Sequence, residues 1–393
     1  MKSGFRGEII TTSASRELAR LVMLDAARIH EEDAMHRARQ AARRGRDEKE
    51  IAPLYTTLDA LDSLDCFGAT ATYGEPLTLA PGIRATFFDA GHILGSAFIL
   101  LELEEGGHRR RVLFSGDMGY GGRAILRDPA PPPHADVVVM ETTYGNRCHK
   151  PLQPSVEELY EAVNDTFHRG GNVVIPSFAL ERSQEILYYL REGVAGGLLP
   201  ASMQVFLDSP MAISATEIFR RHPECYDAAT AALFRGGDDP FSLPGLRLTR
   251  ETAESMAINR ITGGALIMAG SGMCTGGRVR HHLKHNLWRR DCSVIFVGYA
   301  ARGTLARQII DGVRSVRIFR EEIPVRARIH TIGGFSAHAD RDGLLTWFRH
   351  TGRPERTFLV HGEEEVMMEF ASRLQGTRVE RPALHETFPL RSN

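Results

Sequence analysis

Short apolar runs recur along the chain, and many end at a glycine, a serine or a single polar residue before an amphipathic stretch begins. The runs with this pattern are RVLFSGDMG (111–119), VVVMETTYG (137–145), NVVIPSFALERSQEIL (172–187), VFLDSPMA (205–212), ALIMAGSGMCTGGR (265–278), VIFVGYAARGTLARQI (294–309) and TFLVHGEEEVMMEF (357–370). Runs of this kind are typical of buried strands, and helices often follow them. The alternation predicts an α/β fold, with functional side chains beyond the carboxyl ends of its strands.

Composition narrows this picture. The chain has 393 residues, 42% of them hydrophobic, which is enough for about two or three domains. With a net charge of -1, the protein has no overall positive electrostatic field that would attract nucleic acid or a membrane surface. Any site for an anion must therefore be formed by a local group of side chains or backbone N–H groups. The five cysteines form no C-x-x-C pair, which favours a reducing compartment. Without an apolar signal core or a bilayer-length apolar run, we expect a soluble cytoplasmic protein.

One segment departs from the strand–helix pattern. HRARQAARRGRDEKE (36–50) is basic and then acidic, with a helical character. It could guide RNA, but charge runs of this kind are more often solvated helix faces, and we favour that interpretation.

Five polar residues stand alone at the ends of apolar runs. They are His92 in FFDAGHILGSA, Asp117 in FSGDMG, Glu141 in METTYG, His338 in GGFSAHAD and His361 in LVHGEEE. Each alone has a structural explanation, because Asp117 and Glu141 could cap helices and His92 could be a turn histidine. Together, two histidines and an aspartate offer the ligand chemistry of zinc, while a further histidine and glutamate suit proton transfer.

These motifs resemble, in order, those of the β-CASP family of metallo-β-lactamase-fold nucleases, which includes RNA 3′-end-processing endonucleases and bacterial RNA-degrading enzymes. DAGHILGSA resembles the third metal motif, FSGDMG the fourth, METTYG motif A, GGFSAHAD motif B and LVHGEEE motif C. IPSFALERSQE, LDSPMA, AGSGMCTGGR and GYAARGTL are similar to the inserted β-CASP domain. The similarity runs from Gly4 to about Glu386.

The resemblance implies an α/β fold with two domains. Residues 1–150 would be the first part of a metallo-β-lactamase αββα sandwich. Residues 151–313 would form the β-CASP insertion, a doubly wound parallel sheet, and residues 314–393 would return to the first domain. In this interpretation strands around Val316 and Ile329 lead to motifs B and C, and the active cleft lies between the domains.

The resemblance also implies roles for the five polar residues. His92 would bind one zinc ion, Asp117 would bridge two, and His361 would bind the second. His338 would act as the general acid for the leaving ribose oxygen, paired with Glu141, while metal-bound hydroxide attacks the phosphorus. A neighbouring carboxylate suits this role, because it fixes the tautomer and favours the imidazolium form.

The chain departs from the family at the N-terminal H-x-H-x-D-H block, which supplies most zinc ligands and does not occur in this sequence. We therefore expect the metallo-β-lactamase sandwich to be N-terminally incomplete and its zinc occupancy to be low. A misassigned start, a gene fragment or an inactive protein would each explain the missing block.

The nearest histidine cluster, RVRHHLKHNL, has His281 and His285 one helical turn apart. It has no third ligand nearby, so we favour a surface or phosphate-side role for this pair.

Phosphate contacts are predicted from local features. AGSGMCTGGR reads as a strand, a glycine loop and a helix start, which places Ser271 and Gly272 where backbone N–H groups can face a phosphate. Arg182, Arg302 and Lys284 are further candidates, since an arginine offers a bidentate fork. A tight strand–helix connection and solvated surface charges are the structural alternatives.

Three functions follow from these expectations. The first is a zinc-dependent phosphodiesterase that cleaves single-stranded RNA as an endonuclease, with 5′-exonuclease activity as a further option. The second is an inactive RNA-binding or scaffolding homologue. The third is a metallohydrolase of small esters or lactams, which GGFSAHAD and AGSGMCTGGR disfavour. The resemblance also allows a homodimer.

Overall fold

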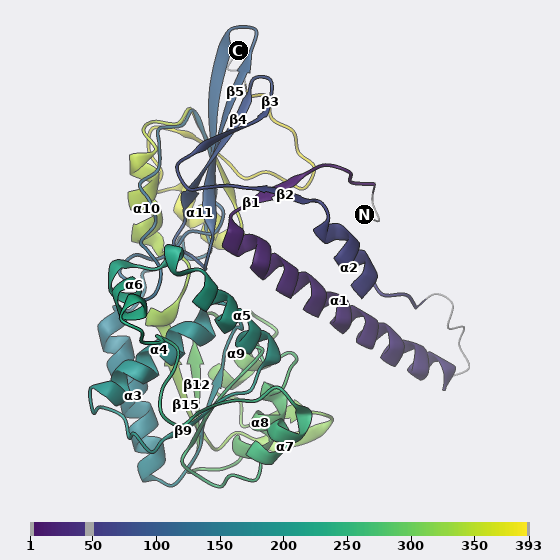
Figure 1. Cartoon of the computed structure of the whole chain (residues 1–393), viewed down its shortest axis with the longest axis vertical. Helices are drawn as coiled ribbons and strands as arrows, with labels where there is room; N and C mark the ends of the chain where they lie inside the picture. Colours follow the sequence, from purple (N-terminus) through teal and green to yellow (C-terminus); the bar gives the residue numbers. More distant parts are fainter. Residues whose placement is uncertain (1–3, 44–50, 391–393) are drawn as a thin grey trace. The chain divides into compact units, whose positions relative to one another are not determined.

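The computed structural model describes residues 4–43 and 51–390, and the predicted α/β architecture is confirmed there (Figure 1). The chain divides into two compact units, Met1–Glu75 and Pro76–Asn393. The first unit contains β1 (Ile9–Thr11), α1 (Ser13–Ala42), α2 (Thr57–Leu64) and β2 (Phe67–Thr70), with the two strands paired in parallel. The charged run 36–50 begins within α1, and residues 44–50 lie outside the described part of the chain.

Side-chain caps explain where the helices of the first unit begin. The Thr12 hydroxyl accepts from the Ser15 N–H at 3.2 Å, before α1. Before α2, Thr56 and Asp59 form a reciprocal capping box. Each cap satisfies backbone N–H groups that have no partner inside the helix.

A seven-stranded mixed sheet lies in the second unit. Its order is β17-β16-β7-β6-β5-β4-β3, with strands β3 (Pro76–Ala80), β4 (Ile83–Asp89), β5 (Ala97–Glu105), β6 (His108–Phe114), β7 (Val137–Glu141), β16 (Arg356–Val360) and β17 (Arg378–Glu380). Strands β3 to β6 are antiparallel neighbours, whereas β6, β7, β16 and β17 run parallel. The loops after β6, β7 and β16 therefore leave from the same edge, and these loops carry FSGDMG, METTYG and HGEEE.

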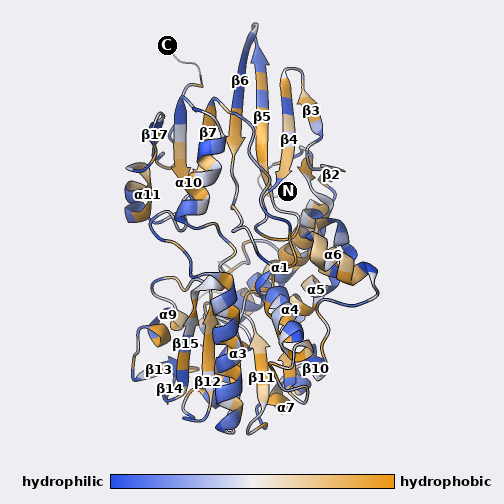
Figure 2. Cartoon of the chain, turned by 90° about the vertical axis from the view of Figure 1, so that its left-hand side faces the viewer, coloured by the Kyte–Doolittle hydropathy of each residue, from blue (hydrophilic) through white to orange (hydrophobic). Residues whose placement is uncertain are grey.

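The second sheet of this unit has six parallel strands (Figure 2). Its order is β10-β9-β11-β8-β12-β15, with strands β8 (Val173–Pro176), β9 (Gln204–Leu207), β10 (Leu246–Leu248), β11 (Ala265–Ala269), β12 (Ser293–Val297) and β15 (Arg328–Ile332). A separate hairpin pairs β13 (Ser315–Ile318) with β14 (Glu321–Pro324).

Helices α3 to α9 accompany the six-stranded sheet, and α10 and α11 follow later in the chain. Their bounds are α3 (Leu152–His168), α4 (Arg182–Ala195), α5 (Pro210–Arg221), α6 (Ala228–Arg235), α7 (Thr252–Ile258), α8 (Val279–Asn286), α9 (Leu305–Ile310), α10 (Arg341–His350) and α11 (Glu364–Ala371). Short 3-10 turns occur at η1 (Pro223–Cys225) and η2 (Gly333–Phe335).

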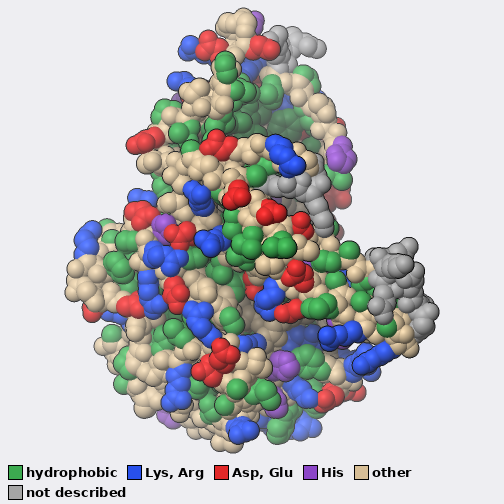
Figure 3. Space-filling view, turned by 45° about the vertical axis from the view of Figure 1, so that its right-hand side comes forward, with side chains coloured by type: hydrophobic (Ala, Val, Ile, Leu, Met, Phe, Trp, Pro, Cys, Tyr) green, Lys and Arg blue, Asp and Glu red, His purple; other side chains and the backbone are tan. Residues whose placement is uncertain are grey.

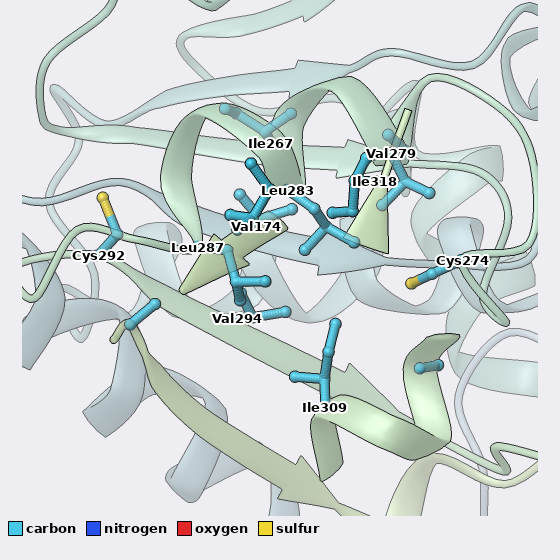
Figure 4. Packing of buried hydrophobic residues seen from close by; sticks show 14 of the residues in the cluster. Val174, Ile267, Cys274, Val279, Leu283, Leu287, Cys292, Val294, Ile309 and Ile318 are labelled. Atoms are coloured by element: carbon cyan, nitrogen blue, oxygen red, sulfur yellow. The ribbon is translucent and has the colours of Figure 1, made fainter. Parts of the chain in front are cut away.

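Each sheet has its own apolar core. One face of the six-stranded sheet packs against α8 and α9, with Val174, Ile267, Leu283 and Ile309 among the buried side chains (Figure 4). The seven-stranded sheet buries Phe98 and Leu113 with side chains of α10 and α11. All five strand positions of β11 and of β12 are buried, as expected of a parallel sheet covered on both faces.

The strand around Ile329 differs from our expectation. We predicted that residues from 314 onward return to the first domain, yet β15 pairs in parallel with β12 in the six-stranded sheet. Val316 and Ile323 of the β13–β14 hairpin are buried in the same core as α8. By contrast, Ala339 and Leu344 belong to the core of the seven-stranded sheet. The chain thus crosses between the sheets at residues 333–338, although the domain limits themselves stay a prediction.

None of the helices within residues 4–43 and 51–390 combines the length and apolar character needed to cross a bilayer. Positive and negative side chains are interspersed over most of the face in Figure 3, in keeping with the net charge of -1.

Candidate active site

His92 lies in the turn that follows β4. Gly91 before it has φ +61°, and a Cβ atom there would lie 2.8 Å from Pro129, so the turn requires glycine. The N–H of His92 donates to the Ser96 hydroxyl at 3.0 Å, which fixes the turn. Burial, and then the neighbouring His338, lower the pKa of His92 to about 4, so its imidazole is neutral at physiological pH. Neutral imidazole is the form that binds metals.

Asp117 lies between two histidines. Its Oδ2 is 3.8 Å from Nε2 of His92, and its Oδ1 is 3.3 Å from Nδ1 of His361. His361 directly follows β16 with φ +48°, an unfavourable conformation for a residue other than glycine. The Thr143 hydroxyl lies 3.1 Å from Nδ1 of His361, and the Thr142 N–H donates to the carbonyl of His361 at 3.2 Å. The two ends of the aspartate carboxylate therefore face different imidazoles.

His338 is paired with Glu141 from the end of β7. Nδ1 of His338 is 3.0 Å from Oε1 and 3.1 Å from Oε2 of the carboxylate. The Ala339 N–H donates to the carbonyl of Met118 at 2.7 Å, and the ring N–H of His149 donates to the carbonyl of His338 at 2.9 Å. The backbone on both sides of the imidazole is thus held in place.

The surroundings of this pair favour its charged form. Burial would raise the pKa of Glu141, but hydrogen bonds from His338, Thr143 and the Met118 N–H outweigh it and lower that pKa. Burial would lower the pKa of His338, but the Glu141 carboxylate outweighs it and raises that pKa. A raised pKa keeps the proton on His338 to higher pH, which suits general-acid chemistry.

The five predicted side chains converge at one place. Ligand atoms of His92, Asp117 and His338 lie within 4.8 Å of one another, as do those of Glu141, His338 and His361. In addition, the His92 and His338 rings are 4.4 Å apart. Their proximity was predicted from the strand ends, and their roles stay predictions.

The donor set can be tested against zinc. Bonds of about 2.0–2.1 Å in a tetrahedral site place neighbouring donor atoms about 3.4 Å apart. The Asp117–His361 contact of 3.3 Å meets this spacing, and the Asp117–His92 contact of 3.8 Å is slightly wider. Nδ1 of His92 is buried without a hydrogen-bond partner in the described residues. His92, Asp117 and His361 therefore fit zinc in donor type and spacing.

The predicted phosphate contacts are more dispersed. Ser271 and Gly272 follow β11, but both the N–H and the hydroxyl of Ser271 are directed at the carbonyl of Gly276, at 3.3 and 3.4 Å. Arg302 is exposed in the loop after β12. Lys284 forms an ion pair with Glu321 at 2.6 Å. None of these positions shows by itself that it binds phosphate.

Arg182 is buried and belongs to a network that our sequence analysis missed. Glu185 lies between Arg182 and Arg123, and its carboxylate pairs with both guanidinium groups. Arg123 also donates to the carbonyls of Gly334, at 3.2 Å, and Ser336, in the loop that carries His338. The spacing of Arg182 and Glu185 on a helix could have indicated their pairing. Arg123 lies four residues beyond FSGDMG and is part of none of the motifs, so the sequence offered no signal for its pairing.

The chain matches two family models. Residues 183–309 match the Beta-Casp domain, and residues 322–382 match the Zn-dependent metallo-hydrolase RNA specificity domain.

Several curated proteins are similar over most of the chain. Ribonuclease TTHA0252 of Thermus thermophilus is 38% identical over 367 residues, which are 93% of this chain and 78% of that protein. Transcription termination factor FttA of Pyrococcus abyssi is 34% identical over 379 residues, 94% of this chain and 55% of that factor. An RNase J-like protein of Methanocaldococcus jannaschii is 30% identical over 332 residues, 83% and 74% of the two chains.

This chain thus spans about half the length of the FttA protein and most of the length of the ribonuclease. The similarities extend over both large sheets and confirm the predicted metallo-β-lactamase fold with a β-CASP insertion. The chain belongs to the β-CASP family of metallo-β-lactamase-fold nucleases, which are hydrolytic enzymes.

Proposed function

We propose that this chain is a zinc-dependent phosphodiesterase that cleaves single-stranded RNA, as an endonuclease with 5′-exonuclease activity as a further option. The observation that carries this proposal is the Glu141–His338 pair, which stands beside an aspartate whose two oxygens face two histidines. A proton donor next to a metal-binding group is the arrangement that phosphodiester hydrolysis requires.

The side chains divide this work between them. His92, Asp117 and His361 would hold the metal, and Asp117 would be shared by two ions. Zinc, when bound, supplies Lewis acidity toward the phosphoryl oxygens. Glu141 occupies Nδ1 of His338, so Nε2 carries the proton that passes to the leaving ribose oxygen. Ser271, Gly272 and Arg302 are our candidates for phosphate contacts.

The names of the relatives support RNA as the substrate, since one is a ribonuclease and another an RNase J-like protein. The description of the matched C-terminal family also names RNA specificity. A small ester or lactam as substrate receives no support from these similarities. We further propose a cytoplasmic location, where such RNA is present, and homodimer formation stays a prediction.

The number of donors supports a second candidate function. Among the described residues the proposed ligands are His92, Asp117 and His361, whereas a zinc site usually takes four ligands. Weak zinc binding would leave a protein that holds RNA without cleaving it.

A cleavage assay on end-labelled single-stranded RNA tests both functions. The chain is incubated with added zinc, with a chelator, and as the His338→Ala variant. We expect cleavage with zinc, which the chelator should abolish and the substitution should slow by about 10²–10⁴-fold. RNA binding without cleavage at any zinc concentration would favour the second function. Products that persist with the chelator would contradict the proposed role of the metal.

A further inference from the structure

Helix α8 has one apolar side and one basic side. Val279, Leu283 and Leu287 point into the core of the six-stranded sheet (Figure 4). At about 100° per residue, the opposite arc of the helix carries a different set of side chains. These are Arg280, His281, Lys284, His285 and, just past the end of the helix, Trp288. Leu287 still has helical φ and ψ angles, so Trp288 continues this arc.

The tip of the β13–β14 hairpin contacts the basic side of α8. Arg280 lies 4.6 Å from the centre of the Phe319 ring, and the His281 ring lies 4.4 Å from it. Phe319 and Arg320 both have positive φ, +51° and +69°. Two-residue hairpin turns of this conformation usually contain Asn-Gly, because bulky residues are strained there. The chain instead presents an aromatic ring and a guanidinium at an exposed tip.

We name this surface the α8–hairpin patch, and its members are Arg280, His281, Lys284, His285, Trp288, Phe319 and Arg320. The side chain of Trp288 is 50% exposed and that of Phe319 is 39% exposed. Partially exposed aromatic rings next to cations form the arrangement on which unpaired bases stack.

Positive charge in the patch is only partly balanced. Among the ion pairs of the described residues, the one that reaches the patch joins Lys284 to Glu321. Burial, and then the cationic neighbours His282, His285, Arg280 and Lys284, lower the pKa of His281. In the domain with the seven-stranded sheet, by contrast, three exposed arginines each have a carboxylate partner, in the pairs Arg84–Glu102, Arg109–Glu104 and Arg373–Glu369.

A metal does not explain this cluster. The sets of three potential ligands found in the described residues lie at the candidate active site, and none includes His281 or His285. A structural role would account for the contacts of Phe319 with α8. It would not account for the exposure of Trp288 and Arg320 beside them.

We propose that the α8–hairpin patch is a second binding site for single-stranded RNA, separate from the cluster of His92, Asp117 and His338. The choice of RNA as the polyanion rests on the proposed function. Cations of the patch would follow the phosphate backbone, while Trp288 and Phe319 would stack on bases. Because α8 begins directly after the loop that contains Ser271 and Gly272, a strand bound here can continue along the same segment toward that loop.

Binding is measured by fluorescence anisotropy with a labelled oligouridylate, in the presence of a chelator so that no cleavage occurs. The test variant combines Arg280→Gln, Lys284→Gln and Arg320→Gln. We expect its affinity to be at least about tenfold lower than that of the unaltered chain, and its slope of log affinity against log salt to be smaller by about 2, which corresponds to three lost phosphate contacts.

A matched variant controls for the change in net charge. Arg84→Gln, Arg109→Gln and Arg373→Gln remove the same three charges from arginines that already have carboxylate partners. We expect less than about a twofold change in affinity from this variant. Equal losses in both triple variants would overturn the patch as a site. Thermal unfolding of each variant shows whether a loss of binding reflects misfolding, and Lys284→Gln alone then provides a milder test.

Tryptophan fluorescence reports on the patch directly, because the chain has two tryptophans and Trp347 is buried. RNA should quench the emission of a Trp347→Phe variant, in which Trp288 is the fluorophore. The same RNA should leave a Trp288→Phe variant unquenched. Quenching that is equal in the two variants would contradict stacking at the patch.

These outcomes separate this proposal from the proposed function. Patch-dependent binding without cleavage would support the second site and contradict the nuclease activity. If the unaltered chain cleaves RNA and the patch variant binds RNA as tightly as the unaltered chain, the nuclease activity would be supported and the second binding site contradicted. Tighter binding of polyglutamate than of RNA at the same salt concentration would show that the patch serves an acidic protein instead.

Discussion

Glu141–His338 and Asp208–His282 are both pairs of a carboxylate and an imidazole that join segments distant in the sequence. The shortest contact is 3.0 Å in the first pair and 2.6 Å in the second. Glu141 and Asp208 are both almost inaccessible to solvent. Their sequence contexts, METTYG and LDSPMA, are also alike in placing one acid at the end of a buried strand.

The second pair is closed on all sides. Both side chains of Asp208–His282 are 0% exposed, and the remaining ring nitrogen of His282 lies 3.0 Å from Oδ1 of Asn259. Thr249, Ser255 and Arg278 also donate to the Asp208 carboxylate. Each polar atom of this network has a partner, which suits a structural role.

The first pair is open on one side. The His338 side chain is 21% exposed, Glu141 engages its Nδ1, and its ring lies next to that of His92. The comparison teaches that the pair itself does not define a catalytic group. Two features distinguish Glu141–His338 from Asp208–His282: the imidazole is accessible to solvent, and further side chains that can bind a metal lie next to it.

The largest expected effect is on turnover of RNA by the His338→Ala variant. Loss of a positioned general acid should lower the rate by about 10²–10⁴-fold, with zinc content unchanged. Metal analysis by mass spectrometry on the same samples provides the control. Because His338 lies within 4.8 Å of ligand atoms of His92 and Asp117, a parallel loss of zinc would show that it is a metal ligand instead.

Asp208→Ala should lower stability and leave turnover unchanged, in contrast to His338→Ala. Removing the carboxylate leaves Arg278 and the buried donors of Ser255 and His282 without their acceptor, so the free energy of unfolding should fall by about 3–5 kcal/mol. Urea unfolding at neutral pH measures this change. The rate per folded molecule should stay unchanged, and a loss below about 1 kcal/mol would contradict the structural role.

Much of this arrangement could be predicted from the sequence. Strands that run in the same direction end at the same edge of a sheet, so the lone polar residues after the apolar runs were expected to meet, and those after β4, β6, β7 and β16 do. His338 reaches the same place from the segment after β15 of the six-stranded sheet. The amphipathic stretch in TFLVHGEEEVMMEF was also expected to be helical, and it forms α11.

The rest depends on contacts that a sequence pattern does not encode. The run ending at Ile332 was correctly predicted as a strand, but its sheet depends on pairing with β12. His282 was overlooked between His281 and His285, because the aspartate that pairs with it is distant in the sequence. Arg182 resembled a phosphate contact until its burial against Glu185 was known.

A smaller effect should be seen in the pH dependence of stability. Burial alone would raise the pKa of Asp208, but hydrogen bonds from His282, Ser255 and Thr249 outweigh it and lower the pKa from 3.8 to about 2. A lowered pKa stabilises the fold above pH 3.8, and that contribution is lost as the pH falls toward 2.

The Asp208 contribution to the pH dependence amounts to about 2 kcal/mol. Asp208→Asn should therefore flatten the acid limb of unfolding free energy against pH, as measured by urea titrations between neutral pH and about pH 2. Parallel curves for the variant and the unaltered chain would show that the carboxylate is not held ionised by its partners.

The smallest effects should come from single hydroxyl groups, and they sharpen the comparison most. Ser255→Ala removes one of several donors to Asp208, at 2.6 Å, so stability should fall by about 1 kcal/mol with no change in zinc affinity. Thr143→Val removes the hydroxyl that donates to the backbone carbonyl of His361, at 3.3 Å, and so helps to position this ligand. Zinc binding should weaken by about tenfold, with unfolding nearly unchanged. Calorimetric zinc titration and urea unfolding of both variants test this crossed pattern. If Thr143→Val instead lowers stability and spares zinc binding, the open site would be held together in the same way as the closed one, and the distinction drawn between the two pairs would fail.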